Sequence, residues 1–213
     1  MSNTFWNMKY SDRNYEWGPD PSAPGRLAVG IARKYGYANI LDIGCGYGRN
    51  ALYIASNGMD VTGIDYSKAG IDMANETADR LGINAKFILA DVLEYPFERE
   101  CYDIAIMSYT RHLLPSHDRL KLIDKIEHLL RHGGRVIDMV PSVRDENYGM
   151  GRRLEKGTYL LRRKKMHYSS HEEVQRDYTG FVLESLKETE IEEKHSDGRV
   201  HNHWTWIVIA LKE

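Results

Sequence analysis

The sequence has very little cysteine, which limits the metal sites and disulfides that its fold can use. Cys45 and Cys101 are its two cysteines; they lie far apart, and neither belongs to a C-x-x-C pair. A zinc knuckle or an iron–sulfur cluster needs several thiolates at short spacing, so the sequence predicts no bound metal. Two isolated thiols favour a reducing compartment over a disulfide-stabilised secreted fold.

The sequence also lacks an excess of positive charge and any long apolar run. Its formal net charge is -2 and its isoelectric point is near 6.5, so it exerts no general attraction on nucleic acid or on an acidic membrane surface. The N-terminal stretch is polar and aromatic where a signal peptide is apolar, and no later run reaches membrane-spanning length. We therefore expect a cytoplasmic protein without a membrane or nucleic-acid partner.

The length of 213 residues is enough for one substantial hydrophobic core and does not require two. We expect a single domain over 1–213, as a monomer or homodimer. Its three parts are an aromatic leader and helix over 1–38, a strand–helix core over 39–140, and a C-terminal segment with a hairpin over 141–213.

From residue 39 onward, short apolar runs alternate with segments of helical period, which is the pattern of an α/β fold with a parallel sheet. The predicted strands are Asn39–Ile43, Asp60–Ile64, Ala85–Leu89, Tyr102–Met107 and Gly134–Val140. Helices are predicted at about 48–57, 67–81 and 116–131, with starts capped by Ser67 and Ser116 and ends at Gly58, Gly82 and the Gly133-Gly134 pair.

Both flanks of this core have their own pattern. Residues 141–165 are charged and irregular, and a capping box, Ser170-x-x-Glu173, then predicts a helix from about residue 169. Two strand-like runs follow, Phe181–Glu193 and His203–Leu211, joined near Asp197-Gly198, a favoured hairpin turn pair. Before the core, Pro24–Tyr35 is predicted to be a helix, and an aromatic leader containing Trp6, Tyr10, Tyr15 and Trp17 precedes it.

A glycine-rich turn follows the first predicted strand and carries the sharpest chemical signal. Asp42 is followed by Gly44, Gly46 and Gly48, with Cys45 inside the loop as a small residue packed under the turn. Glycines let the backbone turn sharply and approach a ligand at the carboxyl end of a strand. The spacing G-x-G-x-G differs from the dinucleotide G-x-G-x-x-G, and Asp42 would repel a pyrophosphate but suit a cationic ligand.

Two more acids stand at the ends of the next two predicted strands. Asp65, in the run Gly-Ile-Asp-Tyr-Ser, lies about twenty residues after the first glycine, where a carboxylate can accept both ribose hydroxyls. Asp91, followed by Val92, can accept from an adenine amino group while apolar neighbours enclose the ring. The three signals are individually weak and strong together, because they occur in order and each at a strand's carboxyl end.

With D-x-G-x-G-x-G, G-x-D-x-S and A-D-V in these places, the sequence resembles the class I S-adenosylmethionine-dependent methyltransferases over about residues 39–140. The resemblance implies a Rossmann-like sheet of seven mostly parallel strands flanked by helices, the last strand antiparallel. It also implies that Asp65 holds the ribose, Asp91 the adenine, and the loop Gly44–Gly48 the methionine end of the cofactor, with S-adenosylhomocysteine as the product. The predicted cofactor-binding residues are Asp42, Gly44, Cys45, Gly46, Gly48, Asn50, Asp65, Tyr66, Asp91, Val92, Ser108 and Trp17.

A narrower resemblance is to the tellurite-resistance and thiopurine-like small-molecule methyltransferases. The helix start Gly48-Arg49-Asn50-Ala51-Leu52-Tyr53 resembles the former, and the leader with Tyr15-x-Trp17-Gly18 resembles both. The resemblance implies that the leader folds over the cofactor, so that Trp17 and Tyr15 contact the methionine moiety or the methyl acceptor.

The segment after the fourth predicted strand, 108–115, stands where the transferred methyl group should point. Tyr109 and His112 could orient or deprotonate an acceptor, although a loop histidine before a helix is as often a cap or surface residue. The Asn-Pro-Pro-aromatic motif that is frequent in amino-methylating members of this superfamily is absent here.

The histidines and the basic residues in the C-terminal part can be interpreted either as functional residues or as ordinary structural ones. Alternation places His201 and His203 on one face of a strand, where they could bind an anion or act as a base, or be ordinary half-buried residues; His167 is similarly open. The basic stretch 152–165 could bind an anionic acceptor or RNA phosphates, although a solvated edge is the simpler reading because it has few aromatic residues for base stacking.

The sequence thus predicts a methyltransferase for a small-molecule acceptor, with His112, Tyr109 and His203 as candidate catalytic residues. An RNA or protein methyltransferase that uses the stretch 152–165 is the first alternative, and a non-catalytic cofactor-binding protein the second. A nicotinamide-dependent oxidoreductase is disfavoured by the glycine spacing and by Asp42.

Overall fold

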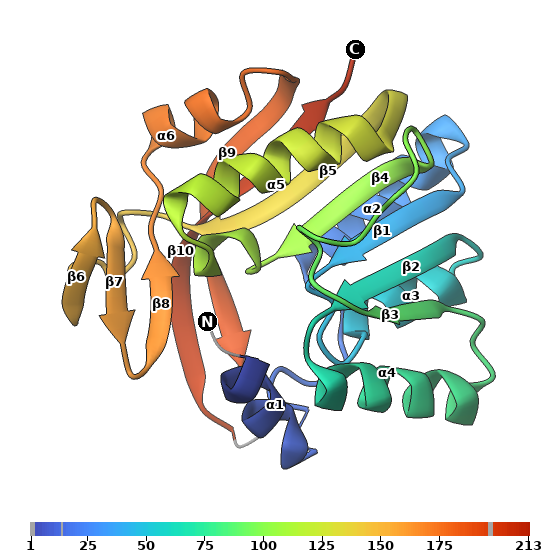
Figure 1. The fold of residues 1–213 in the computed structure, drawn as a ribbon, viewed down its shortest axis with the longest axis horizontal. Coiled ribbons are helices and arrows are strands. Elements are labelled where there is room, and N and C mark those ends of the chain that lie inside the picture. The colour runs from blue at the N-terminus through green and yellow to red at the C-terminus, as the bar shows by residue number, and fades with distance from the viewer. Residues whose placement is uncertain (1–2, 14, 196–197) are drawn as a thin grey trace.

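The computed structural model describes residues 3–13, 15–195 and 198–213, and a seven-stranded sheet forms its centre (Figure 1). The strands stand in the order β3-β2-β1-β4-β5-β10-β9. Their bounds are β1 Asn39–Ile43, β2 Asp60–Asp65, β3 Lys86–Leu89, β4 Tyr102–Ser108, β5 Leu130–Pro141, β9 Val182–Lys194 and β10 Val200–Leu211. β1 to β5 are parallel and β10 runs antiparallel to both β5 and β9, so the predicted sheet and its antiparallel last strand are confirmed.

Helices cover both faces of this sheet, because each central strand carries apolar side chains on both sides. In β4, Ile104 and Ile106 belong to the core under α2 (Ala23–Tyr35) and α3 (Arg49–Ser56), whereas Met107 belongs to the core under α5 (Ser116–Leu129). Such two-sided burial is what a parallel sheet requires. Figure 1 shows α5 in front of the sheet and α2 behind it, with α4 (Lys68–Leu81) beside β3.

A helix in the leader, α1 (Asn3–Ser11), was not predicted. Its segment is polar on average, and its buried side is aromatic: Trp6 and Tyr10 pack with Tyr47 and Met73. Aromatic rings have no strong helical preference, so contacts with the rest of the fold determine this helix rather than its own sequence.

The prediction of an irregular segment over 141–165 is wrong in its second half. Three short antiparallel strands form a separate sheet there, β6 (Arg152–Glu155), β7 (Thr158–Leu161) and β8 (Lys164–His167), seen at the left of Figure 1. The turn between β7 and β8 consists of Arg162 and Arg163, both with positive φ. Turns of that shape normally carry glycine or asparagine, so two arginines do not predict a hairpin.

Three smaller predictions concern helix ends. Ser67 and Ser170 cap α4 and α6 (His171–Asp177) as expected, each accepting from a backbone N–H. Pro115, not Ser116, precedes α5. The Gly133-Gly134 pair does not end α5, because the helix stops at Leu129 and the glycines pair with Lys212 inside the sheet.

The hairpin between β9 and β10 is present, although Asp197 of its predicted turn lies outside the described residues. In the described part of the chain, no helix is both long enough and apolar enough to cross a bilayer.

Candidate active site

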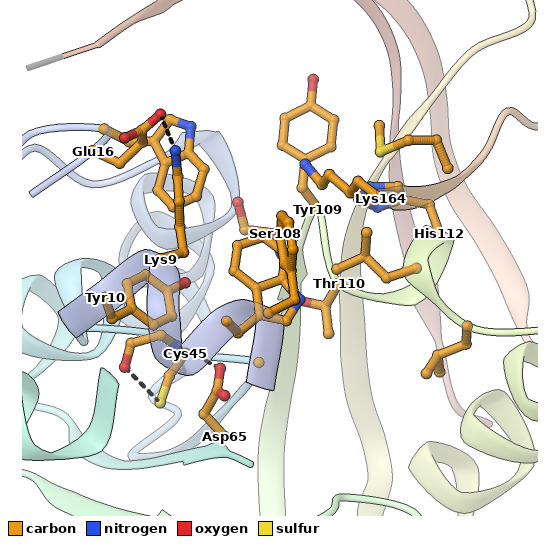
Figure 2. Close-up of a pocket in the computed structure, with 18 of the residues that line it drawn as sticks. Lys9, Tyr10, Glu16, Cys45, Asp65, Ser108, Tyr109, Thr110, His112 and Lys164 are labelled. Atoms are coloured by element: carbon orange, nitrogen blue, oxygen red, sulfur yellow. Dashed lines mark hydrogen bonds and ion pairs between the residues drawn. The ribbon is translucent and has the colours of Figure 1, made fainter. Parts of the chain in front are cut away.

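A large cavity opens at the carboxyl ends of the parallel strands, beside β1 and β4, where the strand order reverses. Ligands of open α/β sheets bind at this position. Its volume of about 1440 Å³ exceeds the roughly 300–1,000 Å³ that holds one small molecule. The strand ends, the glycine loop and α1 supply one side of the wall, and β8 with the β9–β10 hairpin supplies the other. Figure 2 shows Tyr10 of α1 beside Cys45 and Asp65, and Lys164 of β8 beside His112.

The glycine loop between β1 and α3 forms the floor at the sheet end. Gly44, Gly46 and Gly48 all have positive φ, and a Cβ on Gly46 would approach the Tyr10 hydroxyl to 2.6 Å. Larger residues therefore do not fit this turn. Cys45 is buried on the cavity wall, and burial raises the pKa of its thiol, which agrees with its predicted role as a small packed residue.

Asp65, at the end of β2, fixes the loop and also faces the cavity. Its carboxylate accepts from the Gly46 N–H at 2.9 Å and the Ser67 N–H at 2.8 Å. Burial raises its pKa, and these backbone hydrogen bonds oppose that rise. One carboxylate thus links the glycine loop to the start of α4 with acceptor capacity left for hydroxyl groups.

The end of β3 completes this half of the cavity. Asp91 is exposed and accepts from the Leu93 N–H at 2.9 Å, and Val92 lies beside it on the wall. Burial, followed by the charges of Asp65 and Asp91, raises the pKa of Tyr66 to about 12. The carboxylates of Asp65 and Asp91 can accept hydrogen bonds from amino and hydroxyl groups of a ligand, and Val92 offers an apolar surface for its ring.

Two of the predicted cofactor residues, Asp42 and Gly48, do not lie on the wall. Asp42 is 1% exposed and sits behind the loop, where burial raises its pKa to about 7 while a hydrogen bond from the Ala51 backbone opposes that rise. Asn50 does reach the wall, but its Oδ1 already accepts from the backbone N–H and hydroxyl of Ser22. These residues support the loop from behind.

The leader folds over the glycine loop as the narrower resemblance implies. The Trp17 indole N–H donates to Glu193 of β9, and the Trp17 ring stacks on Tyr47 at 6.4 Å between centroids. Trp17 lines the cavity. Tyr15 does not; its hydroxyl pairs with Thr77 at 3.0 Å.

Ser108, Tyr109 and His112 lie on the cavity wall at the end of β4 (Figure 2). Tyr109 has a φ of 54°, which turns its ring toward His112 at 5.7 Å and toward His203 at 6.5 Å. His112 belongs to a 3-10 turn, η1 (Arg111–Leu113), and is 1% exposed; within the described residues both of its ring nitrogens lack a hydrogen-bond partner. Burial, then the charge of Lys164, holds its pKa well below the usual value, so His112 is neutral at pH 7.

His203 on β10 is paired with a residue that sequence reasoning missed. Its Nδ1 lies 2.9 Å from Oδ2 of Asp145, and its Nε2 lies 3.8 Å from Glu193. The hydrogen bond to Asp145 raises the pKa of His203 against the opposing effect of burial. Asp145 stands in the turn after β5, and no motif around it points to a role. The rings of His201 and His203 lie 6.2 Å apart on the cavity wall, as alternation predicted.

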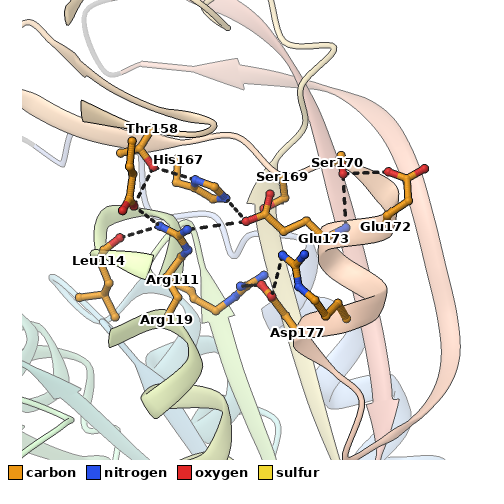
Figure 3. Close-up of polar contacts among 12 residues, drawn as sticks. Arg111, Leu114, Arg119, Thr158, His167, Ser169, Ser170, Glu172, Glu173 and Asp177 are labelled. Atoms are coloured by element: carbon orange, nitrogen blue, oxygen red, sulfur yellow. Dashed lines mark hydrogen bonds and ion pairs between the residues drawn. The ribbon is translucent and has the colours of Figure 1, made fainter. Parts of the chain in front are cut away.

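His167 belongs to a buried polar network instead of the cavity (Figure 3). Its Nδ1 contacts the Thr158 hydroxyl at 2.8 Å, and its Nε2 lies 2.9 Å from Glu173, which also pairs with Arg119 at 3.6 Å. Glu173 therefore joins the small sheet to α5 and α6. In the same region Arg111 is buried between Asp138 at 2.8 Å and Asp177 at 2.6 Å, which fixes η1.

The basic stretch faces mainly outward. Arg152, Arg153 and Arg163 are exposed and off the cavity wall, whereas Arg162 and Lys164 line it. Across residues 3–13, 15–195 and 198–213, no three His, Cys, Asp or Glu side chains are placed to hold a metal ion.

Residues 40–134 match the family model of the methyltransferase domain. The chain is 33% identical over 100 residues to the 27-O-demethylrifamycin SV methyltransferase of Amycolatopsis mediterranei, covering 46% of this chain and 36% of the relative. It is 38% identical over 64 residues to the probable S-adenosyl-L-methionine-dependent methyltransferase TehB of Haemophilus influenzae, covering 30% and 22%. The matches thus span about a third or less of these relatives.

Solved structures share the fold over nearly the whole chain. One solved structure comes from work on the conversion of a disulfide bond into a thioacetal group during echinomycin biosynthesis. It superposes with a TM-score of 0.76 at 23% identity, over 99% of this chain and 92% of that one. The sequence match therefore shows a methyltransferase domain over residues 40–134, which is less than half of the chain, and the structural match shows the fold. TehB of Haemophilus influenzae is similar in fold as well, with a TM-score of 0.69 at 20% identity over 88% of this chain and 62% of that structure.

Proposed function

We propose that this protein transfers a methyl group from S-adenosylmethionine to a small-molecule acceptor. The observation that carries the proposal is the continuity of one large cavity from the glycine loop and Asp65 to Tyr109, His112 and His203. Such a cavity has room for a cofactor at the sheet end and an acceptor at the other. When bound, S-adenosylmethionine supplies an already activated methyl group, so the protein mainly positions and desolvates the reactants.

The cofactor end fits that molecule by the chemistry of its donors and acceptors. We assign the ribose hydroxyls to Asp65, the adenine to Asp91 with Tyr66 and Val92, and the methionine end to the loop 44–48. Ser108 has a buried hydroxyl without a hydrogen-bond partner in the described structure, which suits a ligand atom at the end of β4. Trp17 covers this end from the leader.

At the acceptor end, we assign the base to His203. Its Nδ1 is engaged by Asp145, which leaves Nε2 to accept a proton from a hydroxyl, amine or thiol as that group attacks the methyl carbon. Neutral His112 and the Tyr109 ring then orient the acceptor from the β4 side. The Asp145 carboxylate acts through His203, as a positioning residue.

A small acceptor, a cytoplasmic location and a monomer or homodimer are parts of the same proposal. Cys45 and Cys101 are both free thiols in the described structure, which supports a reducing compartment. A sequence-similar protein supports a small acceptor, since one of the relatives is named for methylating a demethylrifamycin. No observation here favours RNA, because most of the basic stretch faces away from the cavity.

The test is transfer of labelled methyl from S-adenosylmethionine into a cell extract that is then separated into small molecules, RNA and protein. We expect label in the small-molecule fraction. Label only in RNA or protein would instead make the outward-facing arginines a substrate surface. Calorimetry should accompany it: S-adenosylhomocysteine is expected to bind and a nicotinamide dinucleotide is not. The opposite preference would overturn the assignment of the site.

A further inference from the structure

We infer that Lys164 and His112 form the binding site for an anionic group on the methyl acceptor. The inference rests on the proposed function and adds the charge of the substrate. Both side chains lie on the cavity wall across from the glycine loop, and Figure 2 shows them with Tyr109 on the same side of the cavity.

Lys164 is a cation held inside the cavity without an opposite charge in contact with it. It lies on β8, and its Nζ lies 5.4 Å from the centre of the Trp6 ring. In the described part of the chain it forms no ion pair with a carboxylate, whereas Lys9 beside it pairs with Glu16 at 2.8 Å. Burial lowers the pKa of Lys164, and the more distant charge of Glu193 opposes that effect. A partly buried ammonium in this position is stabilised by an anion.

His112 adds a hydrogen-bond donor at the same place. Its ring is buried with both nitrogens unpartnered, so a ligand atom is the missing partner. The charges that act on it come from Lys164, His167, Arg111 and Arg119, and all of them disfavour a positive imidazolium. Of these four groups, Lys164 alone lines the cavity, and Arg111 and Arg119 are paired with carboxylates, so Lys164 supplies the positive charge that a ligand beside His112 meets. A neutral imidazole N–H beside an ammonium suits a carboxylate or phosphate oxygen.

Lys164 and His112 would hold the anionic group of the acceptor apart from His203, the assigned base. The charge of Lys164 acts to lower the pKa of both His112 and His203, and all three side chains line the same cavity. An acceptor that places its anion at Lys164 can present its nucleophile to His203. The carboxylate of the cofactor itself is the competing occupant, and the experiment has to distinguish it.

The experiment is calorimetry on the full chain saturated with S-adenosylhomocysteine, using benzoate, phenyl phosphate and the neutral benzamide as probes. We expect at least one anion to bind at least tenfold more tightly than benzamide, and the carboxylate and phosphate arms identify which anion the site prefers. In Lys164→Met the preference should disappear while affinity for S-adenosylhomocysteine stays unchanged.

Lys165→Met is the matched control, because successive residues of β8 point to opposite faces and Lys165 does not line the cavity. It should retain the anion preference. Equal binding of benzamide, no binding of any probe, or the same loss in both variants would overturn the inference. A loss of S-adenosylhomocysteine affinity in Lys164→Met would assign Lys164 to the cofactor carboxylate instead. If S-adenosylhomocysteine fails to bind the unmodified protein, the proposed function fails instead.

Discussion

The end of the cavity at the glycine loop is built mainly from residues 44–92, with Trp17 of the leader over it, whereas the opposite end draws on four separated segments. At the first end, Asp65 accepts from the backbone N–H groups of Gly46 in the loop and of Ser67, two residues after Asp65 itself. At the second, Tyr109, Asp145, Lys164 and His203 come from the end of β4, the turn after β5, β8 and β10. The cofactor end depends on local backbone geometry, and the acceptor end on long-range packing.

This difference explains why a sequence can indicate the cofactor so much better than the acceptor. The glycine loop and the acid at the end of the next strand have a nearly fixed spacing, because one helix and one strand link them. The acceptor end has no such spacing, so its chemistry can change by substitutions in segments that touch only in the folded protein.

The largest expected effect is at the acceptor end. His203→Asn should lower methyl transfer into the small-molecule fraction by about 10²- to 10⁴-fold, because it removes the assigned base. Affinity for S-adenosylhomocysteine should stay the same. His201→Asn, on the same strand face, is the control and should retain most activity. Equal losses in the two variants would remove His203 from the base role.

The hydrogen-bonded pair of His203 and Asp145 sets the pH dependence of methyl transfer. Asp145 raises the pKa of His203, so a neutral His203 appears only as the pH rises through a value above the ordinary 6.5, and activity should rise with it. In Asp145→Asn the rising limb should move to lower pH, with Glu193 and Lys164 still facing the ring. A pH–rate profile measures this, and an unshifted limb would show that Asp145 does not tune His203.

The buried Arg111 holds η1, which carries His112 of the acceptor end, and breaking its contacts tests how far that end depends on packing. Arg111→Met leaves Asp138 and Asp177 buried without their cation, which should lower the free energy of unfolding by about 3–5 kcal/mol. Denaturant titration measures it. Arg13→Met, which breaks an exposed pair with Glu76, should change the free energy of unfolding far less. Similar losses would mean that the buried network adds nothing specific.

At the cofactor end, Asp65→Ala should weaken binding of S-adenosylhomocysteine by about 1–3 kcal/mol, or roughly 5- to 150-fold, through loss of its hydrogen bonds. Calorimetry measures the affinity, and a melting curve separates it from any loosening of the loop. Asp72→Asn, on the exposed side of α4, should bind normally. An unchanged affinity in Asp65→Ala would exclude Asp65 from the site.

The smallest expected effects on stability are those of two helix caps, Ser67 of α4 and Ser170 of α6. Ser67→Ala should lower the free energy of unfolding by about 1–2 kcal/mol, because its buried hydroxyl both caps α4 and donates to Asn7 of the leader. Ser170→Ala should lower it by only about 0.5–1 kcal/mol, since its hydroxyl is partly exposed and its other contact, with Glu172, is on the surface. Thermal unfolding measures both, and a reversed order would show that burial does not set the value of these caps.

The sequence predicted the strands of the core to within a few residues, because each is a short apolar run between turn signals. It missed α1, whose helix depends on aromatic contacts with Tyr47 and Met73, and the β6–β8 sheet, whose Arg162-Arg163 turn lacks the usual residues. In the site, it named Asp65 and His203 from local pattern, but it could not name Asp145 or single out Lys164. Asp145 meets His203 only when the turn after β5 packs beside β10, and Lys164 reaches the cavity only when β8 packs on η1.

The contacts between the leader and the hairpin have a consequence for how the protein is made. Trp17 pairs with Glu193, and Glu16 with His195 at 3.2 Å, so the wall of the cavity joins residues about 180 positions apart in the chain. A ribosome releases the first partner of each contact long before it has synthesised the second. The cavity can therefore close only after translation of the hairpin, and the leader stays exposed to solvent and to chaperones until then.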